Sequence, residues 1–111
     1  MNEILKQQLE QARSASRKLA LRTVDEVNRA LSAIADAAER NADKLLAANA
    51  EDLARMDASD PRYDRLRLTP ERIREIAEGI RSVAALESPV GKVLSSWQRP
   101  NGMRISKVAV P

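Results

Sequence analysis

The segment Leu66–Val93 constrains the fold most, because it contains signals for the start and the end of a helix and then changes its period. Thr69 predicts the N-cap, since its hydroxyl can accept a backbone N–H of the first turn, and Pro70 suits the first helical position. The sequence at 88–91, Ser-Pro-Val-Gly, predicts the end of this helix. In between, apolar residues recur with the spacing of one helical face: Ile73, Ile76, Ala77, Ile80, Val83 and Ala84. None of these groups can carry out catalysis, so the segment predicts architecture and leaves function to other parts of the chain.

The composition excludes several classes of functional site. Hydrophobic residues make up 43% of the 111 residues and charged residues 32%, which is typical of a globular domain or of part of one. The absence of cysteine and histidine excludes zinc sites of the usual kind, cysteine nucleophiles and histidine acid–base catalysis. The three glycines are too scattered for a phosphate-binding loop. A polar N-terminus and the lack of a long apolar run predict a cytoplasmic chain with no membrane partner.

The charge pattern argues against a nucleic-acid partner. The chain has 19 basic and 16 acidic residues, for a formal net charge of +3. Acidic residues alternate with basic ones along the chain, so no helix presents a basic face. Tyr63 and Trp97 are the only aromatic residues, which is too few for base stacking. We therefore expect no nucleic-acid binding.

Helical periodicity covers most of the first 54 residues. A first helix is predicted from about Asn2 to Ala20, and a second follows Thr23 as its cap. Asn41 either caps a third helix or marks a bend in a continuous one. The first helix is expected to bury a stripe formed by Leu5, Leu9, Ala12, Ser16 and Leu19. Asn49 falls on the apolar stripe of the third helix, where we interpret it as a hydrogen-bonded core amide in preference to a ligand contact.

The segment from Asp57 to Thr69 is predicted to be a loop that carries a cluster of arginines. Asp60-Pro61 is a turn signal, and Tyr63, Leu66 and Leu68 are expected to hold the loop against the helices. The arginines Arg62, Arg65, Arg67 and Arg72 have two interpretations: a phosphate site, or a surface rim paired with Asp60, Asp64 and Glu71. We favour the rim, since exposed ion pairs are common and individually weak.

The residues after Gly91 predict a β-hairpin. Two short alternating segments flank Asn101-Gly102, which is the strongest short hairpin signal. A two-residue turn there would set Val93 opposite Val110 and Trp97 opposite Ser106. The same turn would set Arg99 opposite Arg104, which is unfavourable, so a longer loop is the alternative.

The predicted fold class is therefore mainly α, with about four amphipathic helices in residues 1–88 and a C-terminal β-hairpin in residues 89–111. A lone hairpin is marginally stable in water, and this one carries Val93, Leu94, Trp97, Ile105, Val108 and Val110. We expect it to need a partner surface. The final residues still have the pattern of a strand, from which we expect a longer protein.

Four segments together are similar to one enzyme family. They are QARSASRKLA at 11–20, VNRALSAIADAAERNADKLLAANAEDL at 27–53, YDRLRLTPERIREIAEGIRSVAALESPVGKV at 63–93 and PNGMRISKVAVP at 100–111. In this order they resemble the N-terminal region of the γ-glutamyl phosphate reductases, also called glutamate-5-semialdehyde dehydrogenases, of the aldehyde dehydrogenase superfamily. The third segment is the most specific, because its short loop, helix and PVG turn distinguish these reductases from ordinary aldehyde dehydrogenases.

The resemblance implies an enzyme of proline biosynthesis with an α/β aldehyde-dehydrogenase-like fold. In that family a cysteine thiolate attacks γ-glutamyl phosphate, and NADPH reduces the resulting thioester to the semialdehyde. The cofactor and catalytic domains that carry these groups are absent from this chain, so we predict no catalytic, cofactor-binding or metal-binding residue in it and no activity of the isolated chain. By the same resemblance, the helices brace the cofactor domain and the hairpin begins an oligomerisation arm, which implies a homo-oligomer and self-association through the hairpin.

Two hypotheses from other functional classes compete with the hypothesis of an enzyme fragment. Amphipathic helices without catalytic groups, followed by an open hairpin, also fit a stand-alone helical protein-interaction module. A small basic nucleic-acid binder is the third hypothesis, and its binding would fall steeply with salt.

Overall fold

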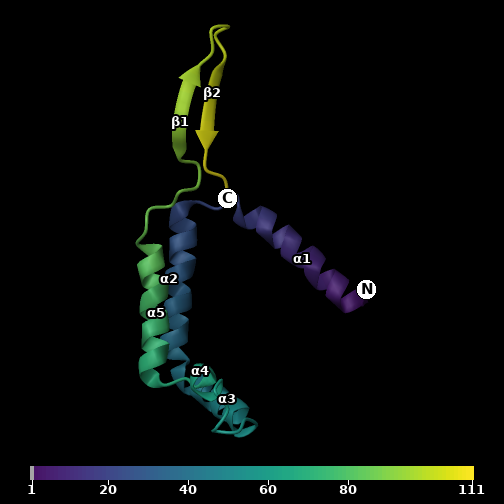
Figure 1. The fold of residues 1–111 in the computed structure, drawn as a ribbon, viewed down its shortest axis with the longest axis vertical. Coiled ribbons are helices and arrows are strands. Elements are labelled where there is room, and N and C mark those ends of the chain that lie inside the picture. The colour runs from purple at the N-terminus through teal and green to yellow at the C-terminus, as the bar shows by residue number, and fades with distance from the viewer. Residues whose placement is uncertain (1) are drawn as a thin grey trace. The chain divides into compact units, whose positions relative to one another are not determined.

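The computed structural model describes residues 2–111, which form helices followed by a two-stranded antiparallel sheet (Figure 1). The elements in chain order are α1 (Glu3–Leu19), α2 (Val24–Arg40), α3 (Ala42–Ala54), α4 (Tyr63–Leu66), α5 (Pro70–Ala84), β1 (Val93–Gln98) and β2 (Arg104–Val108). This confirms the predicted class of mainly helical chain with a C-terminal hairpin. The short helix α4 lies in the segment that was predicted to be a loop, so the described chain has one helix more than expected.

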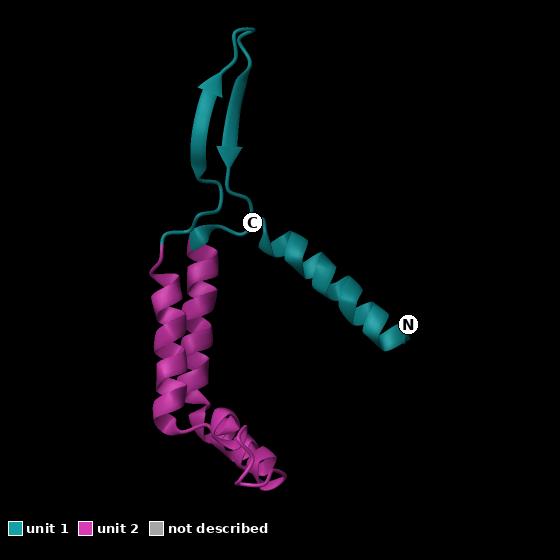
Figure 2. Ribbon diagram, viewed as in Figure 1, with its two compact units in different colours: residues 1–24, 87–111 teal, residues 25–86 magenta. Residues whose placement is uncertain are grey.

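The chain divides into two compact units, which are coloured separately in Figure 2. Unit 1 combines the residues up to Val24 with Glu87–Pro111, and therefore contains α1 and the hairpin. Unit 2 is the continuous segment Asp25–Leu86, which contains nearly all of α2 and the whole of α3, α4 and α5.

In unit 1, α1 is a well-capped helix whose apolar face is exposed. The Asn2 side-chain oxygen accepts a hydrogen bond from the backbone N–H of Ile4 at 2.8 Å and so caps the helix, which begins close to its predicted start at about Asn2. The predicted burial of its stripe is wrong for this chain, because Leu5, Leu9 and Leu19 are 48%, 54% and 63% exposed. Periodicity shows which face of a helix is apolar, but the burial of that face depends on whether another surface covers it.

In unit 2, α2 and α5 run side by side, and most of the core lies on these two helices (Figure 1). Among the described residues, the buried hydrophobic ones are Ala35 on α2 and Ile73 and Ala77 on α5. Two of the three are alanines, so the core of unit 2 is small. Polar contacts must therefore contribute much of the specificity of its packing.

The junction of α2 and α3 is a one-residue interruption at Asn41. The backbone N–H of Asn41 donates to Ala37 at 2.9 Å, and the N–H of Leu45 donates to Asn41 at 3.0 Å, so helical hydrogen bonding continues through the junction. The prediction that the Asn41 side chain caps α3 is wrong, since its amide nitrogen donates back to the Ala37 carbonyl at 2.8 Å. The backbone at Asn41 (φ −102°, ψ 19°) departs from the α-helical region, so the alternative of a bend describes the junction better.

The start of α5 follows the sequence signals. The Thr69 hydroxyl accepts a hydrogen bond from the backbone N–H of Arg72 at 3.1 Å, and Pro70 occupies the first helical position. The helix ends at Ala84, several residues before the predicted stop. The Pro89–Lys92 segment instead forms a separate turn, closed by the Lys92 N–H to Pro89 carbonyl bond at 3.1 Å, in which Gly91 has a φ of 78°.

The hairpin turn is longer than the two-residue turn predicted. The Gly102 N–H donates to the Arg99 carbonyl at 2.9 Å, the Arg99 N–H donates to Met103 at 2.7 Å, and Gly102 has a φ of 88°. A two-residue loop would make residues 100 and 103 a pair that exchanges two hydrogen bonds, and Pro100 has no N–H to donate one of them. The turn therefore takes in Pro100, the register moves by one so that Trp97 pairs with Ile105, and the longer-loop alternative is confirmed.

A bulge interrupts the other end of the hairpin. Val93 pairs with Val108 and Ser95 with Lys107, so Leu94 is an extra residue in β1. The predicted pairing of Val93 with Val110 is therefore also wrong. All six residues of β1 are exposed, and both strands have an unpaired edge within the described chain.

Candidate functional site

The buried polar residue of unit 2 is Asn49, which lies on α3 and is 8% exposed. Its side-chain nitrogen donates to the Leu66 carbonyl at 2.9 Å, and its side-chain oxygen accepts from the Leu68 N–H at 2.8 Å. One amide thus satisfies the backbone on both sides of Arg67, at the point where the chain leaves α4. This confirms the interpretation as a hydrogen-bonded core amide that fixes packing.

The arginines around α4 pair with neighbouring acidic residues and with the backbone. Arg62 makes a bidentate contact to Asp60, with its Nη2 2.7 Å from one carboxylate oxygen and its Nε 3.0 Å from the other. Arg72 reaches Asp64 at 3.2 Å, and its Nη1 donates to the carbonyls of Asp64 and Arg67. The Arg67 guanidinium lies 3.5 Å from Asp64. These contacts confirm the predicted pairing for Arg62, Arg67 and Arg72 with Asp60 and Asp64. Among the described residues, the predicted partner Glu71 and the arginine Arg65 form no ion pair.

The same rim lines a surface depression that was the best candidate for a phosphate site. Its lining residues are Asp64, Arg65, Arg67, Leu68, Arg72, Glu75 and Ile76. Two carboxylates therefore stand among three guanidinium groups, and two of these guanidiniums are already paired with Asp64. The depression is nearly balanced in charge, which makes it a poor binding site for a free anion.

An ion-pair network joins α2 to α5, and sequence reasoning did not find it. One guanidinium nitrogen of Arg81 lies 2.6 Å from Glu39 and 2.8 Å from Glu78, and the other lies 2.8 Å from Asp36. Asp36 and Glu39 are three residues apart beside the apolar stripe of α2, and Arg81 flanks the stripe of α5. That placement was the available signal, but only the packing of the two helices shows that the groups meet.

The electrostatic effect of this network is to stabilise the charged forms. The hydrogen bond from Arg81 holds the pKa of the Glu39 carboxyl below its ordinary value of 4.5. The hydrogen bonds that Arg81 donates to Glu39, Asp36 and Glu78 raise its own pKa. Glu39 and Arg81 therefore stay ionised near neutral pH, which suits this pair to structural pairing.

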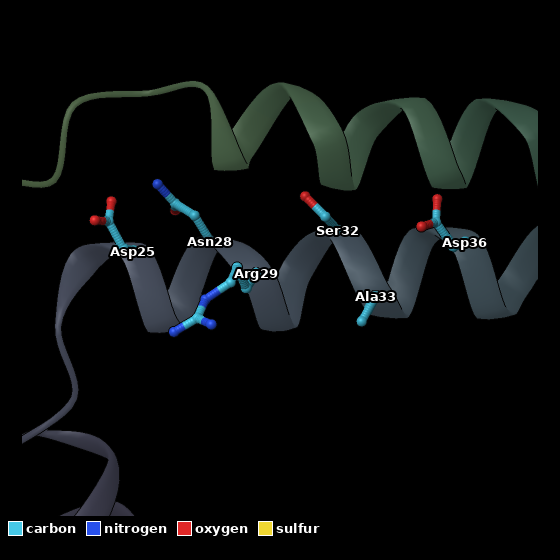
Figure 3. A pocket seen from close by; sticks show the side chains of 6 residues that line it. All are labelled: Asp25, Asn28, Arg29, Ser32, Ala33 and Asp36. Carbon is cyan, nitrogen blue, oxygen red and sulfur yellow. The ribbon is translucent and has the colours of Figure 1, made fainter.

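A shallow polar depression lies on α2 itself. Figure 3 shows Asp25, Asn28, Ser32 and Asp36 on the side of α2 that faces α5, whereas Arg29 and Ala33 point elsewhere. Asp36 is already engaged by Arg81. All six residues lie on one helix at the spacing of a single broad face, and five of them are exposed. The depression is therefore part of the surface of α2, and its side chains do not converge on one point.

The described residues, 2–111, contain neither a cluster suited to a metal ion nor a helix suited to span a membrane. No cluster of three or more histidine, cysteine, aspartate or glutamate residues there is arranged to hold a metal ion. None of the helices there combines the length and the apolar character that crossing a bilayer requires.

The remaining candidate surfaces are apolar. On α1, a shallow groove is lined by Ala12, Ala15, Ser16, Lys18, Leu19 and Arg22. On the hairpin, Leu94 is 57% exposed and Trp97 is 46% exposed. Exposed side chains of this size are typical of surfaces that another polypeptide covers.

Comparison with known proteins shows one enzyme to which the chain is similar. The chain is 50% identical over 109 residues to the gamma-glutamyl phosphate reductase of Phocaeicola vulgatus, covering 98% of this chain and 26% of the relative. It is 51% identical over 98 residues to the enzyme of the same name from Bacteroides thetaiotaomicron, covering 88% of this chain and 24% of the relative. No protein-family model matches.

The fold leads to the same enzyme. The crystal structure of gamma-glutamyl phosphate reductase from Thermotoga maritima matches with a TM-score of 0.89 and 33% identity, over 99% of this chain and 27% of that one. In sequence and in fold, the chain matches a segment of gamma-glutamyl phosphate reductase. The resemblance stated from the sequence is thereby confirmed. The chain spans about a quarter of the length of the gamma-glutamyl phosphate reductases it matches.

The first prediction concerns Asn49. Asn49→Ala should lower the free energy of unfolding by about 1–3 kcal/mol, because the Leu66 carbonyl and the Leu68 N–H both lose a partner. Urea denaturation followed by circular dichroism measures the loss, and amide hydrogen exchange should show faster exchange at Leu68. Asn28→Ala on the surface of α2 is the control, and unchanged exchange at Leu68 in Asn49→Ala would contradict the bridging role.

The second prediction concerns acid. Because the pKa of Glu39 is lower in the folded chain, its contribution to stability is complete above about pH 4.5 and is lost as the pH falls through the folded value. Glu39→Gln should therefore flatten the fall of unfolding free energy with decreasing pH in that range. Denaturation curves at a series of pH values test this, with Glu10→Gln on α1 as the control. Equal slopes for wild type and Glu39→Gln would disprove it.

Proposed function

We propose that this chain is the N-terminal scaffold of a gamma-glutamyl phosphate reductase, with a helical region at residues 1–88 and the start of an oligomerisation arm at residues 89–111. The observation that carries the proposal is the identity of about 50% to curated relatives over nearly the whole chain. The apolar surfaces of α1 and of the hairpin support it, because a scaffold must present such surfaces to the polypeptide that it braces.

The proposed parent reaction is the reduction of γ-glutamyl phosphate to glutamate 5-semialdehyde and phosphate, with NADPH, in cytoplasmic proline biosynthesis. An aldehyde-dehydrogenase-like α/β fold would carry it. The reaction needs a nucleophile to take up the acyl group, and this chain has no cysteine. We therefore propose that no residue of this chain is catalytic and that the chain alone is inactive.

The residues of this chain do not fit NADP(H). A dinucleotide site of the usual kind places closely spaced glycines between a strand and the N-terminus of a helix. Here Gly79 lies inside α5, Gly91 in the turn before β1 and Gly102 in the hairpin turn. The cofactor is accordingly assigned to the remaining three quarters of the enzyme, and no step of the reaction is derived for this chain.

The scaffold role follows from the energetics of apolar surface. Leu5, Leu9 and Leu19 on α1 are about half exposed or more. Full burial of a leucine stabilises a protein by roughly 1.5–3 kcal/mol relative to full exposure, so covering this face would contribute substantially to assembly. The same exposed faces also fit a helical protein-interaction module, which is the alternative function, and the experiment below separates the two.

Reconstitution tests the scaffold. The chain should show no phosphate-dependent reduction of NADP with glutamate 5-semialdehyde, and neither should the separately expressed remainder of the Phocaeicola vulgatus enzyme. Mixing the two should restore activity. Leu9→Asp should prevent restoration by placing a charge on the apolar face of α1, whereas Ser14→Asp on the opposite face should not.

Each alternative outcome has a definite meaning. Activity of the chain alone would disprove the assignment of all catalytic groups to the remainder. Full activity of the remainder without this chain would disprove the scaffold and favour the interaction module.

We also propose that the hairpin mediates self-association. Its two edges are unpaired within the described chain, and unpaired edges with exposed apolar side chains are templates for pairing with another copy. In the parent enzyme the same arm would contribute to a homo-oligomer.

Self-association should be visible in sedimentation velocity as a mass that rises with concentration. The fluorescence of Trp97, the single tryptophan, should shift to the blue over the same range as the ring becomes covered. Trp97→Lys should weaken association at least tenfold, while Ser14→Lys, which adds the same charge on α1, should leave it unchanged. A monomer at all concentrations would contradict the proposal.

A further inference from the structure

The hairpin turn contains the one Asn-Gly pair of the sequence. The other asparagines, at positions 2, 28, 41 and 49, are followed by Glu, Arg, Ala and Ala. Glycine matters here because it has no side chain to shield its own backbone nitrogen or to restrict its rotation. Both Asn101 and Gly102 are exposed, so water reaches the pair.

We propose that Asn101 is a site of spontaneous deamidation. The Gly102 backbone nitrogen gives up its proton and attacks the side-chain amide carbon of Asn101, forming a carbon–nitrogen bond. The side-chain nitrogen takes up a proton and leaves as ammonia, which closes a five-membered succinimide ring. Water then opens the ring at either carbonyl, giving aspartate or isoaspartate. The step consumes one water, releases one ammonia and needs no oxidant or reductant.

The folded turn restrains both reacting groups. The Gly102 N–H donates to the Arg99 carbonyl at 2.9 Å, so the attacking nitrogen is held in a hydrogen bond. The Asn101 side-chain oxygen accepts from the Met103 N–H at 3.0 Å, which holds the amide that would be attacked. Ring closure therefore requires the turn to open, and the rate of deamidation is set by how often it opens.

This hairpin is expected to open readily. A two-stranded sheet with both faces exposed has little buried surface to hold it closed. The other four asparagines precede residues with side chains, and three of them lie within or between helices. Asn101 combines the most reactive local sequence with the least protected element.

The product would differ from the original turn in charge and in length. A carboxylate replaces a neutral amide near Arg99 and Arg104, so the formal net charge of +3 falls by one. Isoaspartate also adds a methylene to the backbone of the turn. Because side chains alternate across a strand, a change in turn length disturbs the register on which Trp97 and Ile105 pair. The inference concerns this chain directly and holds whether or not the proposed enzymatic function is correct.

A cross-strand disulfide tests the dependence on opening. Ser96 and Ser106 pair across the strands with their Oγ atoms 3.1 Å apart. Counting from the hydrogen-bonded pair Arg99 and Met103, they form a non-hydrogen-bonded pair, whose short Cα separation suits a disulfide. The chain has no cysteine of its own, so S96C/S106C offers one defined bridge.

The experiment incubates wild type and S96C/S106C, the latter both oxidised and reduced, and follows isoaspartate by mass spectrometry of tryptic peptides. Wild type and the reduced variant should deamidate at Asn101 at similar rates, and the oxidised variant roughly tenfold or more slowly, since a disulfide disfavours opening by at least that factor. The peptides that contain Asn28, Asn41 and Asn49 are internal controls. Asn101→Gln should abolish the loss of charge on isoelectric focusing.

Two results would overturn the inference. No isoaspartate at position 101, or no more than at Asn28, Asn41 and Asn49, would show that the Asn-Gly pair is not a modification site. Equal rates in the oxidised and reduced variants would show that turn opening does not control the reaction.

Discussion

The buried amide of Asn49 is the contact on which the helical unit depends. It joins α3 to the backbone at Leu66 and Leu68, immediately before the Thr69 cap that starts α5. If either bond were absent, a part-buried backbone group would lose its partner, which costs more than an ordinary hydrogen bond contributes. Two contacts therefore fix the position of α5. The Asn49 side chain holds the segment that leads into the helix, and Arg81 bridges from the helix to the carboxylates Asp36 and Glu39 of α2.

This reliance on polar contacts reflects the small core. The buried hydrophobic residues of the described chain are two alanines and one isoleucine. Alanine contributes little apolar area, so burial alone cannot specify how these helices pack. Larger apolar side chains are present but lie on the exposed faces of α1 and the hairpin. The chain covers about a quarter of its relatives' length. Under the proposed scaffold role, these faces would lie against the rest of the enzyme.

The charged groups of unit 2 and the apolar faces of α1 and the hairpin differ in whether they have partners within the described chain. In unit 2, the ion pairs around Asp64 and Arg81 join neighbouring segments of the chain. The apolar faces are unpaired, so they are suited to contact with other polypeptide. The proposed bracing of a reductase by α1, the proposed self-association of the hairpin and the proposed deamidation of Asn101 all concern surfaces outside the small core.

Local signals in the sequence determined the cap at Thr69, the periodic helices and the existence of a hairpin, because each depends on residues within a few positions of one another. Even the placement of Asn49 on an apolar stripe indicated a satisfied core amide. Only the tertiary structure decided that its partners are the backbone at Leu66 and Leu68, that Arg81 meets two carboxylates of α2, and that the apolar stripe of α1 is exposed in this chain. The reason is physical: a sequence states which groups are apolar or charged, but whether they are covered or paired depends on what distant segments bring to them.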